Sequence, residues 1–339
     1  MAIWLLMLAV FSVSLFLTWV LRRYALARSL MDIPNVRSSH SVPTPRGGGV
    51  AIVLSFLMTV PLLAFFFDVS WSYVWALWGA GALIAIVGFL DDHGHIAARW
   101  RLLAHFTGAI WALFWLGGLP SVHMFGVEFN LSWLGHFCAV LYLVWMLNLY
   151  NFMDGIDGIA SVQAVSSCLG ACAIYWFAGE TSLIWPPLLL AVAVLGFLYW
   201  NFPPARIFMG DAGSGFLGLI LGIFSVQAAW SSSRFLWVWL ILLGVFIVDA
   251  TFTLIRRLLR GDKVYEAHRS HAYQFASRQF GRHLPVTLAV LVINLLWLLP
   301  IAVCVGLLGL DGIMGLTLAY APLVLLALRF HAGELEKIG

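Results

Sequence analysis

The stretch NLYNFMDGIDGI, residues 148–159, decides how this chain is organised. It follows an apolar run and carries Asp154 and Asp157 three positions apart, each with a glycine directly after it. On a helical turn this spacing places both carboxylates on one face, and the glycines leave that face open to another backbone or to a phosphate. Ionisable groups at a membrane boundary usually mark a functional site, although a polar loop at a helix end fits the same residues.

The composition of the whole chain indicates a membrane protein made of helices. Of its 339 residues, 63% are hydrophobic and only 10% are charged, which excludes an ordinary soluble domain. The 17 tryptophans suit aromatic belts at the two membrane surfaces. The sequence has no alternating segments of the kind that a transmembrane β-barrel needs. We therefore predict an all-α, polytopic membrane protein that forms a single domain over residues 1–339.

The apolar runs predict about eleven transmembrane helices, each near the roughly 20 residues that a bilayer needs. Their expected ranges are 2–21, 48–67, 72–90, 102–118, 136–150, 158–178, 183–200, 215–232, 235–255, 285–308 and 312–330. All of the 18 lysines and arginines except Arg234 then fall on one side of the membrane. Because basic residues stay in the cytoplasm, we expect the N-terminus to be periplasmic and the C-terminus to be cytoplasmic.

The polar residues gather on the predicted cytoplasmic side. The longest loops there, 22–47 and 256–284, are too short to form a soluble catalytic domain with its own core. We therefore expect an active site at the cytoplasmic membrane face. Besides residues 148–159, this side carries four polar patches, at residues 32–49, 91–92, 201–215 and 256–284.

The first two patches suggest phosphate binding and acid–base chemistry. Arg37, His40 and Arg46 would bind a phosphate, unless they only follow the positive-inside rule. Asp91 and Asp92 are adjacent, so on a helix they point about 100° apart, and we expect them to have different roles. A solvated helix end is the plain alternative for this pair.

The last two patches could hold an anion or a metal. Asp211 stands in a proline- and glycine-rich segment before an apolar run, where the amides of a helix start favour an anion or a metal-bound phosphate. A simple turn between helices would also fit. His268, Arg269 and His271 suit a diphosphate. Two histidines at this spacing could instead bind zinc, but the glutamate of the His-Glu-x-x-His pattern is missing.

The carboxylates indicate a divalent cation. Five of them are expected on one face, and they would repel a phosphate substrate unless a cation lay between: Asp91, Asp92, Asp154, Asp157 and Asp211. Hard oxygen ligands without thiolates favour Mg²⁺ or Mn²⁺. The sequence has neither a Walker loop nor a dinucleotide-binding fingerprint.

Two other classes of protein compete with a phosphate-transfer enzyme. A transporter or channel would use intramembrane acids as a relay, but only Asp249 clearly lies inside a predicted span. A zinc-dependent membrane hydrolase would use His268 and His271 as ligands, with the missing glutamate against it.

Six motifs follow one another on the predicted cytoplasmic side. They are Asp32-x-Pro-Asn, Thr44-Pro-x-Gly-Gly, Asp91-Asp92, Asn148-x-x-Asn-x-x-Asp-Gly-x-Asp-Gly158, Phe208-Met-Gly-Asp-x-Gly-Ser214, and Asp249-Ala through Arg256-Arg257 to His268-x-x-His271. In this order they resemble the polyprenyl-phosphate N-acetylhexosamine-1-phosphate transferases, the family of WecA and MraY. The chain looks most like O-antigen-initiating members such as WbpL. The resemblance covers about residues 30–275 and leaves the predicted C-terminal helices at about 285–330 outside.

The resemblance implies a reaction at the bacterial inner membrane. A UDP-N-acetylhexosamine gives its sugar-1-phosphate to undecaprenyl phosphate and UMP is released, which initiates O-antigen, lipopolysaccharide or another cell-envelope glycan. It implies Mg²⁺, with Mn²⁺ as a substitute, and a homodimer is compatible with it. No nucleic-acid partner is implied. The sequence does not distinguish GlcNAc from FucNAc or QuiNAc, and it leaves a covalent intermediate open beside the direct attack that we favour.

The resemblance also implies roles for individual residues. Asp211 and Asn151 would be the metal ligands, and Asp91, beside Asp92, would deprotonate or orient the lipid phosphate. The remaining catalytic positions would be Asp154 and Asp157, linked to nucleotide binding and site geometry, and His268 and His271 near the diphosphate. The implied substrate-binding residues are Arg37, Arg46, Arg99, Asn148, Phe208, whose ring would stack on uracil, and Arg269.

Overall fold

The computed structural model describes residues 3–34, 39–94, 96–262 and 268–335. The α-helices are α1 (Ile3–Ala27), α2 (Val50–Phe66), α3 (Trp71–His93), α4 (Ala98–Leu116), α5 (Ser132–Met153), α6 (Ile159–Ala178), α7 (Trp185–Asn201), α8 (Asp211–Ser231), α9 (Ser233–Leu242), α10 (Gly244–Leu259), α11 (Ala272–Phe280), α12 (Leu284–Ile293), α13 (Leu299–Leu307) and α14 (Gly312–Arg329). A 3₁₀ turn, η1 (Thr181–Leu183), precedes α7, and a π-helical segment, η2 (Asn294–Leu298), joins α12 to α13.

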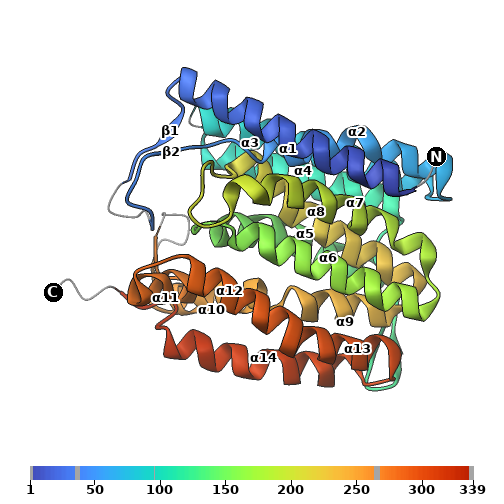
Figure 1. Ribbon diagram of the computed structural model, residues 1–339. Helices are drawn as coiled ribbons and strands as arrows, with labels where there is room; N and C mark the ends of the chain where they lie inside the picture. Colours follow the sequence, from blue (N-terminus) through green and yellow to red (C-terminus); the bar gives the residue numbers. More distant parts are fainter. Residues whose placement is uncertain (1–2, 35–38, 95, 263–267, 336–339) are drawn as a thin grey trace.

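Two short antiparallel strand pairs interrupt the helices. β1 (Met31–Asp32) pairs with β2 (Thr44–Pro45), and β3 (Val122–Met124) pairs with β4 (Val127–Phe129). The strand pairs lie at opposite ends of the bundle (Figure 1). β1, β2, α10, α11 and the C-terminus lie at its left-hand end, while the N-terminus lies at its right-hand end. We call the end with β1 and β2 the site end.

The prediction of an all-α, polytopic membrane protein is confirmed, but the count of eleven spans is not. In the described part of the chain, eight helices are long and apolar enough to cross a membrane, or nine if the bent pair α9–α10 is one span. α2 is shorter, with 17 residues. α4 carries Arg99 and Arg101 in its first turn, so its apolar part is shortened.

The predicted span at 235–255 corresponds to two helices, α9 and α10. The chain bends by 73° between α9 and α10, at Leu243. The physical reason lies in the polar residues of α10, since Asp249 accepts hydrogen bonds from Ala272 and Tyr273 at the start of α11. A straight continuation of α9 would carry this carboxylate away from α11.

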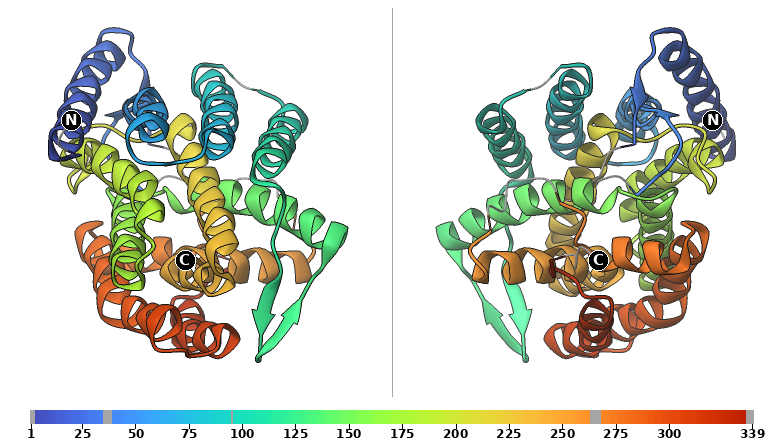
Figure 2. Two further views of the ribbon diagram at one scale, coloured as in Figure 1. Left: turned by 90° about the vertical axis from the view of Figure 1, so that its right-hand side faces the viewer. Right: turned by 90° about the vertical axis from the view of Figure 1, so that its left-hand side faces the viewer.

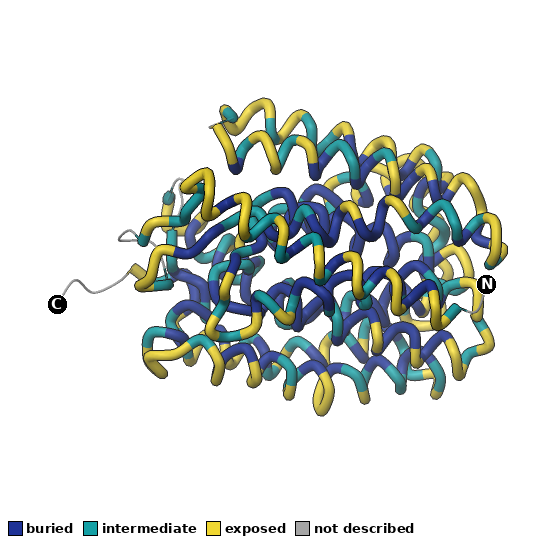
Figure 3. The backbone as a smooth tube through the Cα atoms, turned by 45° about the horizontal axis from the view of Figure 1, so that its top comes forward, coloured by how far each residue is buried: buried dark blue, intermediate teal, exposed yellow. Residues whose placement is uncertain are grey.

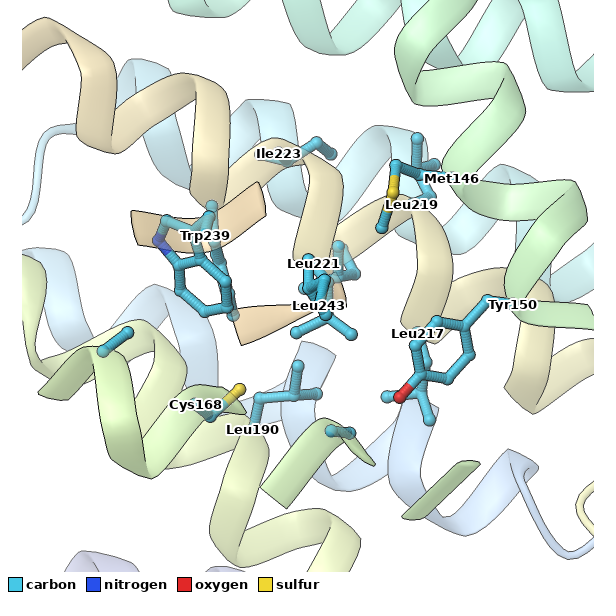
Figure 4. Close-up of a cluster of buried hydrophobic side chains, with 14 of the residues drawn as sticks. Met146, Tyr150, Cys168, Leu190, Leu217, Leu219, Leu221, Ile223, Trp239 and Leu243 are labelled. Atoms are coloured by element: carbon cyan, nitrogen blue, oxygen red, sulfur yellow. The ribbon is translucent and has the colours of Figure 1, made fainter. Parts of the chain in front are cut away.

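The core of the bundle is built around α8. Figure 2 shows α8 in the middle of the ring of helices, with the β3–β4 hairpin projecting beyond it. Buried residues concentrate in the interior of the bundle (Figure 3), and 94% of the most apolar window of α8 is buried. Side chains of α8, such as Leu217 and Leu221, contribute to an apolar cluster together with Tyr150, Cys168 and Trp239 (Figure 4).

Glycines let α8 approach its neighbours closely. A Cβ at Gly218 would lie 2.4 Å from the carbonyl oxygen of Met146 on α5, and a Cβ at Gly88 on α3 would lie 2.6 Å from the amide nitrogen of Ala212. Small residues are the usual means of close packing between helices in membranes. They hold α8 against α3 and α5, whose ends carry Asp91, Asp92 and Asp154.

Candidate functional site

Two adjoining cavities lie at the site end. The first, here called the polar cavity, has a volume of about 270 Å³ and is lined by five carboxylates, Asp32, Asp92, Asp154, Asp157 and Asp211. The second, here called the amphipathic cavity, has a volume of about 230 Å³ and combines Asp91, Arg101, His105 and Asn148 with the apolar side chains Ile84, Val87, Leu102 and Leu147. Asn151 and Asp211 line both cavities, so the two spaces meet at these residues.

Three separate segments supply four acids of this site. Asp91 and Asp92 end α3, Asp154 caps the C-terminus of α5, and Asp211 is the first residue of α8. The packing of α3 and α5 on α8 therefore brings together groups that lie 60 to 120 positions apart in the chain, as the hydrogen bonds of Asn151 and Asp92 show.

Asp92 is a buried cap of α8. Its Oδ1 accepts a hydrogen bond from the amide of Asp211 at 3.2 Å, and its Oδ2 accepts one from Ala212 at 3.3 Å. A carboxylate at a helix N-terminus is favoured by the free amides and the helix dipole. Arg46 donates to the main-chain carbonyl of Asp92. Asp92 therefore fixes the position of Asp211 and ties it to the loop before α2.

Asp91 faces the other cavity and is paired with Arg101. Its Oδ2 accepts from the Arg101 guanidinium at 2.5 Å, and its Oδ1 accepts from the amide of Ile96 at 2.9 Å. The guanidinium of Arg101 also lies 3.8 Å from Asp211 Oδ2. Arg101 thus places one positive charge between two carboxylates at the point where the cavities meet. The two adjacent acids of α3 do different things, as their angular separation predicts.

Asp154 lies among like charges. Burial, followed by the negative charges of Asp211, Asp92 and Asp157, raises the pKa of the Asp154 carboxyl well above its usual range. A group in this position either takes up a proton or attracts a cation. The electrostatics of the polar cavity therefore favour a positively charged ligand.

Asp157 holds three segments together. Its Oδ2 accepts from the amide of Ala205 at 3.0 Å, and its Oδ1 lies 3.0 Å from Nδ1 of His283. Nε2 of His283 is 3.0 Å from the carbonyl oxygen of Ser39. Burial opposes the charge on His283, but the hydrogen bond and charge of Asp157 and the carbonyl of Ser39 outweigh it, so the pKa of His283 is raised.

An aromatic group forms another part of the polar cavity. The rings of Phe208 and His40 meet edge to face with their centroids 4.9 Å apart, and both residues line the cavity together with Arg46. The backbone holds Phe208 in place, because its amide donates to Pro45 at 2.8 Å and its carbonyl accepts from Gly48 at 2.9 Å. This loop could present a planar surface to a base.

The junction of the cavities offers carboxylate, amide and hydroxyl oxygens from Asp211, Asn151 and Ser214. Asn151 donates from its amide nitrogen to Asp211 at 3.0 Å and to Ser214 at 2.9 Å. Among the residues that the structure describes, no group of three His, Cys, Asp or Glu could hold a metal ion, and zinc prefers such a set. Mg²⁺ usually takes one or two carboxylates and completes its shell with water and substrate phosphates.

Several residues that the sequence singled out lie elsewhere. Arg99 is exposed, with its guanidinium 5.7 Å from the centre of the Trp100 ring. His268, Arg269 and His271 line neither of the two cavities. Arg37 lies outside the described residues. Their predicted roles stay predictions.

The histidine motif instead belongs to the start of α11. His271 is buried, with Nδ1 3.3 Å from Asp249 Oδ1, and it forms a capping box with Gln274. The ring of His268 stacks on it at 4.9 Å between centroids. Burial and the nearby charges of His271 and Arg257 lower the pKa of His268 to about 3. His268 is therefore neutral near pH 7.

The structure adds residues that the sequence reading did not select. Arg101, His105, Gln274 and His283 line the cavities. Arg101 lies ten positions after Asp91. The two residues are on different helices, α4 and α3, so helical periodicity does not predict that they meet. His283 lies beyond the last motif, so only its contact with Asp157 reveals it.

The fold and the site together define a polytopic membrane protein. At one end of its helix bundle, a cluster of carboxylates lies beside the guanidinium groups of Arg46 and Arg101. Residues 74–229 match the sequence profile described as Glycosyl transferase family 4. The chain is 31% identical over 289 residues to a probable undecaprenyl-phosphate N-acetylglucosaminyl 1-phosphate transferase of Bacillus subtilis, covering 83% of this chain and 78% of that protein. The chain belongs to the polyprenyl-phosphate N-acetylhexosamine-1-phosphate transferase family, so the resemblance of the six motifs is confirmed.

Other relatives extend the range of the similarity. An undecaprenyl-phosphate alpha-N-acetylglucosaminyl 1-phosphate transferase of Thermotoga maritima is 29% identical, over 84% of this chain and 87% of that protein. A phospho-N-acetylmuramoyl-pentapeptide-transferase of Streptococcus pneumoniae is 30% identical, over 67% of this chain and 72% of that protein. The similarity therefore reaches relatives whose names give different transferred groups.

Proposed function

We propose that this protein transfers N-acetylhexosamine-1-phosphate from a UDP-N-acetylhexosamine to undecaprenyl phosphate and releases UMP. The observation that carries the proposal is that Asn151 and Asp211 line both a polar and an amphipathic cavity. A water-soluble donor and a lipid acceptor need different surroundings but must meet at one phosphorus atom. The names of the relatives support the acceptor and the transferred group.

The polar cavity suits the sugar nucleotide. Phe208 and His40 offer an aromatic surface to the uracil ring, since offset and edge contacts between π-systems are favourable. Arg46 lines the same cavity and can pair with a phosphate oxygen. The hydrogen bonds of the Phe208 backbone hold the aromatic surface in position before the donor arrives.

The amphipathic cavity suits the lipid phosphate. Arg101 supplies a guanidinium beside Asp91 and Asp211, and guanidinium groups bind phosphate with two parallel hydrogen bonds. Leu102 and Val87 line the same cavity and can contact the first isoprenoid units. A phosphate bound to Arg101 would lie beside Asp211, on the side opposite the polar cavity.

The residues at the junction would hold Mg²⁺. Asp211 would contribute a carboxylate, and Asn151 would contribute its amide oxygen after its side-chain amide, whose nitrogen now faces Asp211, turns over. When bound, Mg²⁺ neutralises the leaving diphosphate. Asp92 fixes Asp211 through the amides of α8. Mn²⁺, which takes the same ligands, is the expected substitute.

The protein then needs little acid–base chemistry of its own. A phosphate monoester is nucleophilic once ionised, so Asp91, which is paired with Arg101, need only orient the lipid phosphate or accept its last proton. Positioning and charge neutralisation dominate phosphoryl-type transfer. We favour direct attack by the lipid phosphate over a covalent intermediate on a carboxylate, because the two substrates can occupy separate cavities that meet at Asp211.

The proposed setting is the bacterial inner membrane, with a periplasmic N-terminus and a cytoplasmic site end. The product, undecaprenyl-diphospho-N-acetylhexosamine, would initiate O-antigen, lipopolysaccharide or another cell-envelope glycan. A homodimer stays a prediction.

The decisive experiment is an assay of the purified protein in detergent with undecaprenyl phosphate and a panel of UDP-GlcNAc, UDP-FucNAc, UDP-QuiNAc and UDP-glucose. UMP release is measured with Mg²⁺, with Mn²⁺ and with EDTA, and the lipid product is identified by its mass. We expect UMP and a diphospholipid from at least one N-acetylhexosamine, with no turnover in EDTA. Failure of every donor, or release of free sugar phosphate without a lipid product, would refute the proposed transfer.

A further inference from the structure

One polar group in the polar cavity has no role in the site as described above. The side chain of Gln274, on α11, lines the cavity although the residue is only 6% exposed. Its Oε1 accepts a hydrogen bond from the amide of His271 at 3.2 Å. Among the residues that the structure describes, its Nε2 has no hydrogen-bond partner. Nε2 is therefore open to the space of the cavity, where it can donate a hydrogen bond to a ligand.

The orientation of this amide is set by the helix that carries it. Gln274 occupies the third position of α11 and closes the capping box with His271. Because Oε1 is held by the cap, the NH₂ group must point away from the helix start. It lies next to the turn after α5, since a Cβ built on Gly155 would be 3.3 Å from Nε2. The donor therefore lies beside Gly155, the residue after Asp154.

α11 itself is anchored from both sides. Asp249 on α10 accepts hydrogen bonds from the amides of Ala272 and Tyr273, each at 3.0 Å. The hydroxyl of Tyr273 donates to the carbonyl oxygen of Phe152 at 2.9 Å. The amide of Gln274 is thus held against the α5–α6 turn before any ligand binds. Such preorganisation lowers the entropic cost of a hydrogen bond to a ligand.

We infer that Gln274 recognises the donor substrate by donating a hydrogen bond from Nε2 to a neutral oxygen of the transferred sugar, a hydroxyl or the acetamido carbonyl. The inference rests on the proposed function. A neutral oxygen is favoured over the diphosphate because the surrounding side chains are acidic, with Asp154 adjacent to Gly155 and Asp211 on the same cavity. An amide N–H next to carboxylates pairs well with a hydroxyl or carbonyl that carries no charge.

The test uses a variant that separates the cap from the donor. Gln274→Glu keeps an acceptor for the His271 amide but removes the NH₂ group, and Gln274→Met removes both without adding charge. The matched control is Gln279→Glu, because Gln279 is exposed on the same helix. For each protein the KM for the UDP-sugar, the inhibition constant of UMP and the thermal unfolding midpoint are measured with the full-length chain in detergent.

We expect KM for the sugar nucleotide to rise about tenfold in Gln274→Met and Gln274→Glu, as expected for one lost hydrogen bond, while the UMP inhibition constant stays at the wild-type value. Gln279→Glu should match the wild type. An equal rise in the UMP constant would overturn the inference, because UMP carries no sugar. A wild-type KM in both Gln274 variants would also overturn the inference. The proposed function would then still stand, because it is tested separately by UMP release from the wild-type protein.

Discussion

Asn151 donates a hydrogen bond to the carboxylate of Asp211 over 3.0 Å and joins the last turn of α5 to the first residue of α8. These two residues are also the ones that line both cavities. A change at either of them therefore acts on both substrates of the proposed reaction at once.

The carboxylates at this junction provide the most direct test of the chemistry. We expect Asp211→Asn and Asp91→Asn each to lower kcat/KM for UMP release by about 10²-fold or more, because preorganised charges at the reacting group contribute on this scale. Asp68→Asn is the control, since Asp68 lies in the turn between α2 and α3, at the end away from the site. Full activity of either variant at the site would remove that residue from the mechanism.

The contact between α3 and α8 should not tolerate a methyl group. Gly88→Ala would gain up to about 1 kcal/mol of helix propensity, but the new Cβ would lie 2.6 Å from the backbone nitrogen of Ala212. Overpacking costs about 1–3 kcal/mol, so we expect a net loss of stability together with a loss of UMP release. Thermal unfolding in detergent measures the first effect.

Gly94→Ala is the control for this experiment, because the nearest atom to its Cβ, the carbonyl oxygen of Leu90, is 3.8 Å away. If Gly88→Ala unfolded at the wild-type temperature and kept full activity, the close approach of α3 and α8 would not position Asp211.

The anchoring of α11 should affect activity as well as stability. Asp249→Asn replaces a carboxylate that accepts hydrogen bonds from two amides and from His271, and hydrogen bonds to a charged group contribute about 1.5–3 kcal/mol. We expect a lower unfolding midpoint and a lower kcat/KM for UMP release, since α11 carries Gln274 into the polar cavity.

Asp311→Asn is the matched comparison. Asp311 caps α14 by accepting from Ile313 and Met314, and it accepts from Phe125 in the β3–β4 hairpin. Because asparagine caps a helix about as well as aspartate, this change should lower the unfolding midpoint only slightly and leave kcat/KM unchanged. An equal loss of kcat/KM in both variants would show that the anchoring of α11 contributes to stability but does not position groups in the polar cavity.

The pair of His283 and Asp157 predicts a pH dependence of stability. The pKa of His283 is raised in the folded protein, so the protonated histidine stabilises the fold. This contribution is complete below the unfolded-state pKa of about 6.5 and is lost as the pH rises through the folded-state pKa. Wild type and His283→Gln should therefore differ most in unfolding midpoint near pH 6 and least near pH 9. A difference that grew with pH would contradict the assignment.

The arrangement of the bundle in the membrane predicts where reporters should appear. α8 has 21 residues, which span about 30 Å, so Arg234 lies at the end opposite Asp211. We expect a reporter fused after Arg234 to be periplasmic and one fused after Asp262 to be cytoplasmic. Exchanged locations would place the site end in the periplasm and contradict the proposed access of the sugar nucleotide, and reporters on the same side would contradict the predicted crossing between Arg234 and Asp262.

Much of the site could be predicted from local spacing. Asp91 and Asp92 are predicted to have different roles because neighbours on a helix point about 100° apart. The helical turn expected at Asp154 and Asp157 is absent, since α5 ends at Met153 and α6 begins at Ile159, although both acids line the polar cavity. In the structure, Asp92 caps α8 while Asp91 pairs with Arg101. The particular partners, however, lie on other helices.

The least predictable features depend on contacts across the bundle. Arg101 and not Arg99 enters a cavity, and the histidine motif caps α11 beside Asp249. The bend before α10 accompanies the same contact of Asp249 with α11. In each case the side chain's role depends on which helix packs against it, and that information is not contained in a single segment.

The sequence by itself determined that the chain is an all-α membrane protein and a member of its transferase family, because apolar run length and motif order are properties of the linear chain. Only the tertiary structure decided that Asn151 and Asp211 stand between a polar and an amphipathic cavity, and that Gln274 and His283 belong beside them. The physical reason is that glycines such as Gly88 and Gly218 set how closely α3 and α5 approach α8, and this distance places the side chains of distant segments around one point.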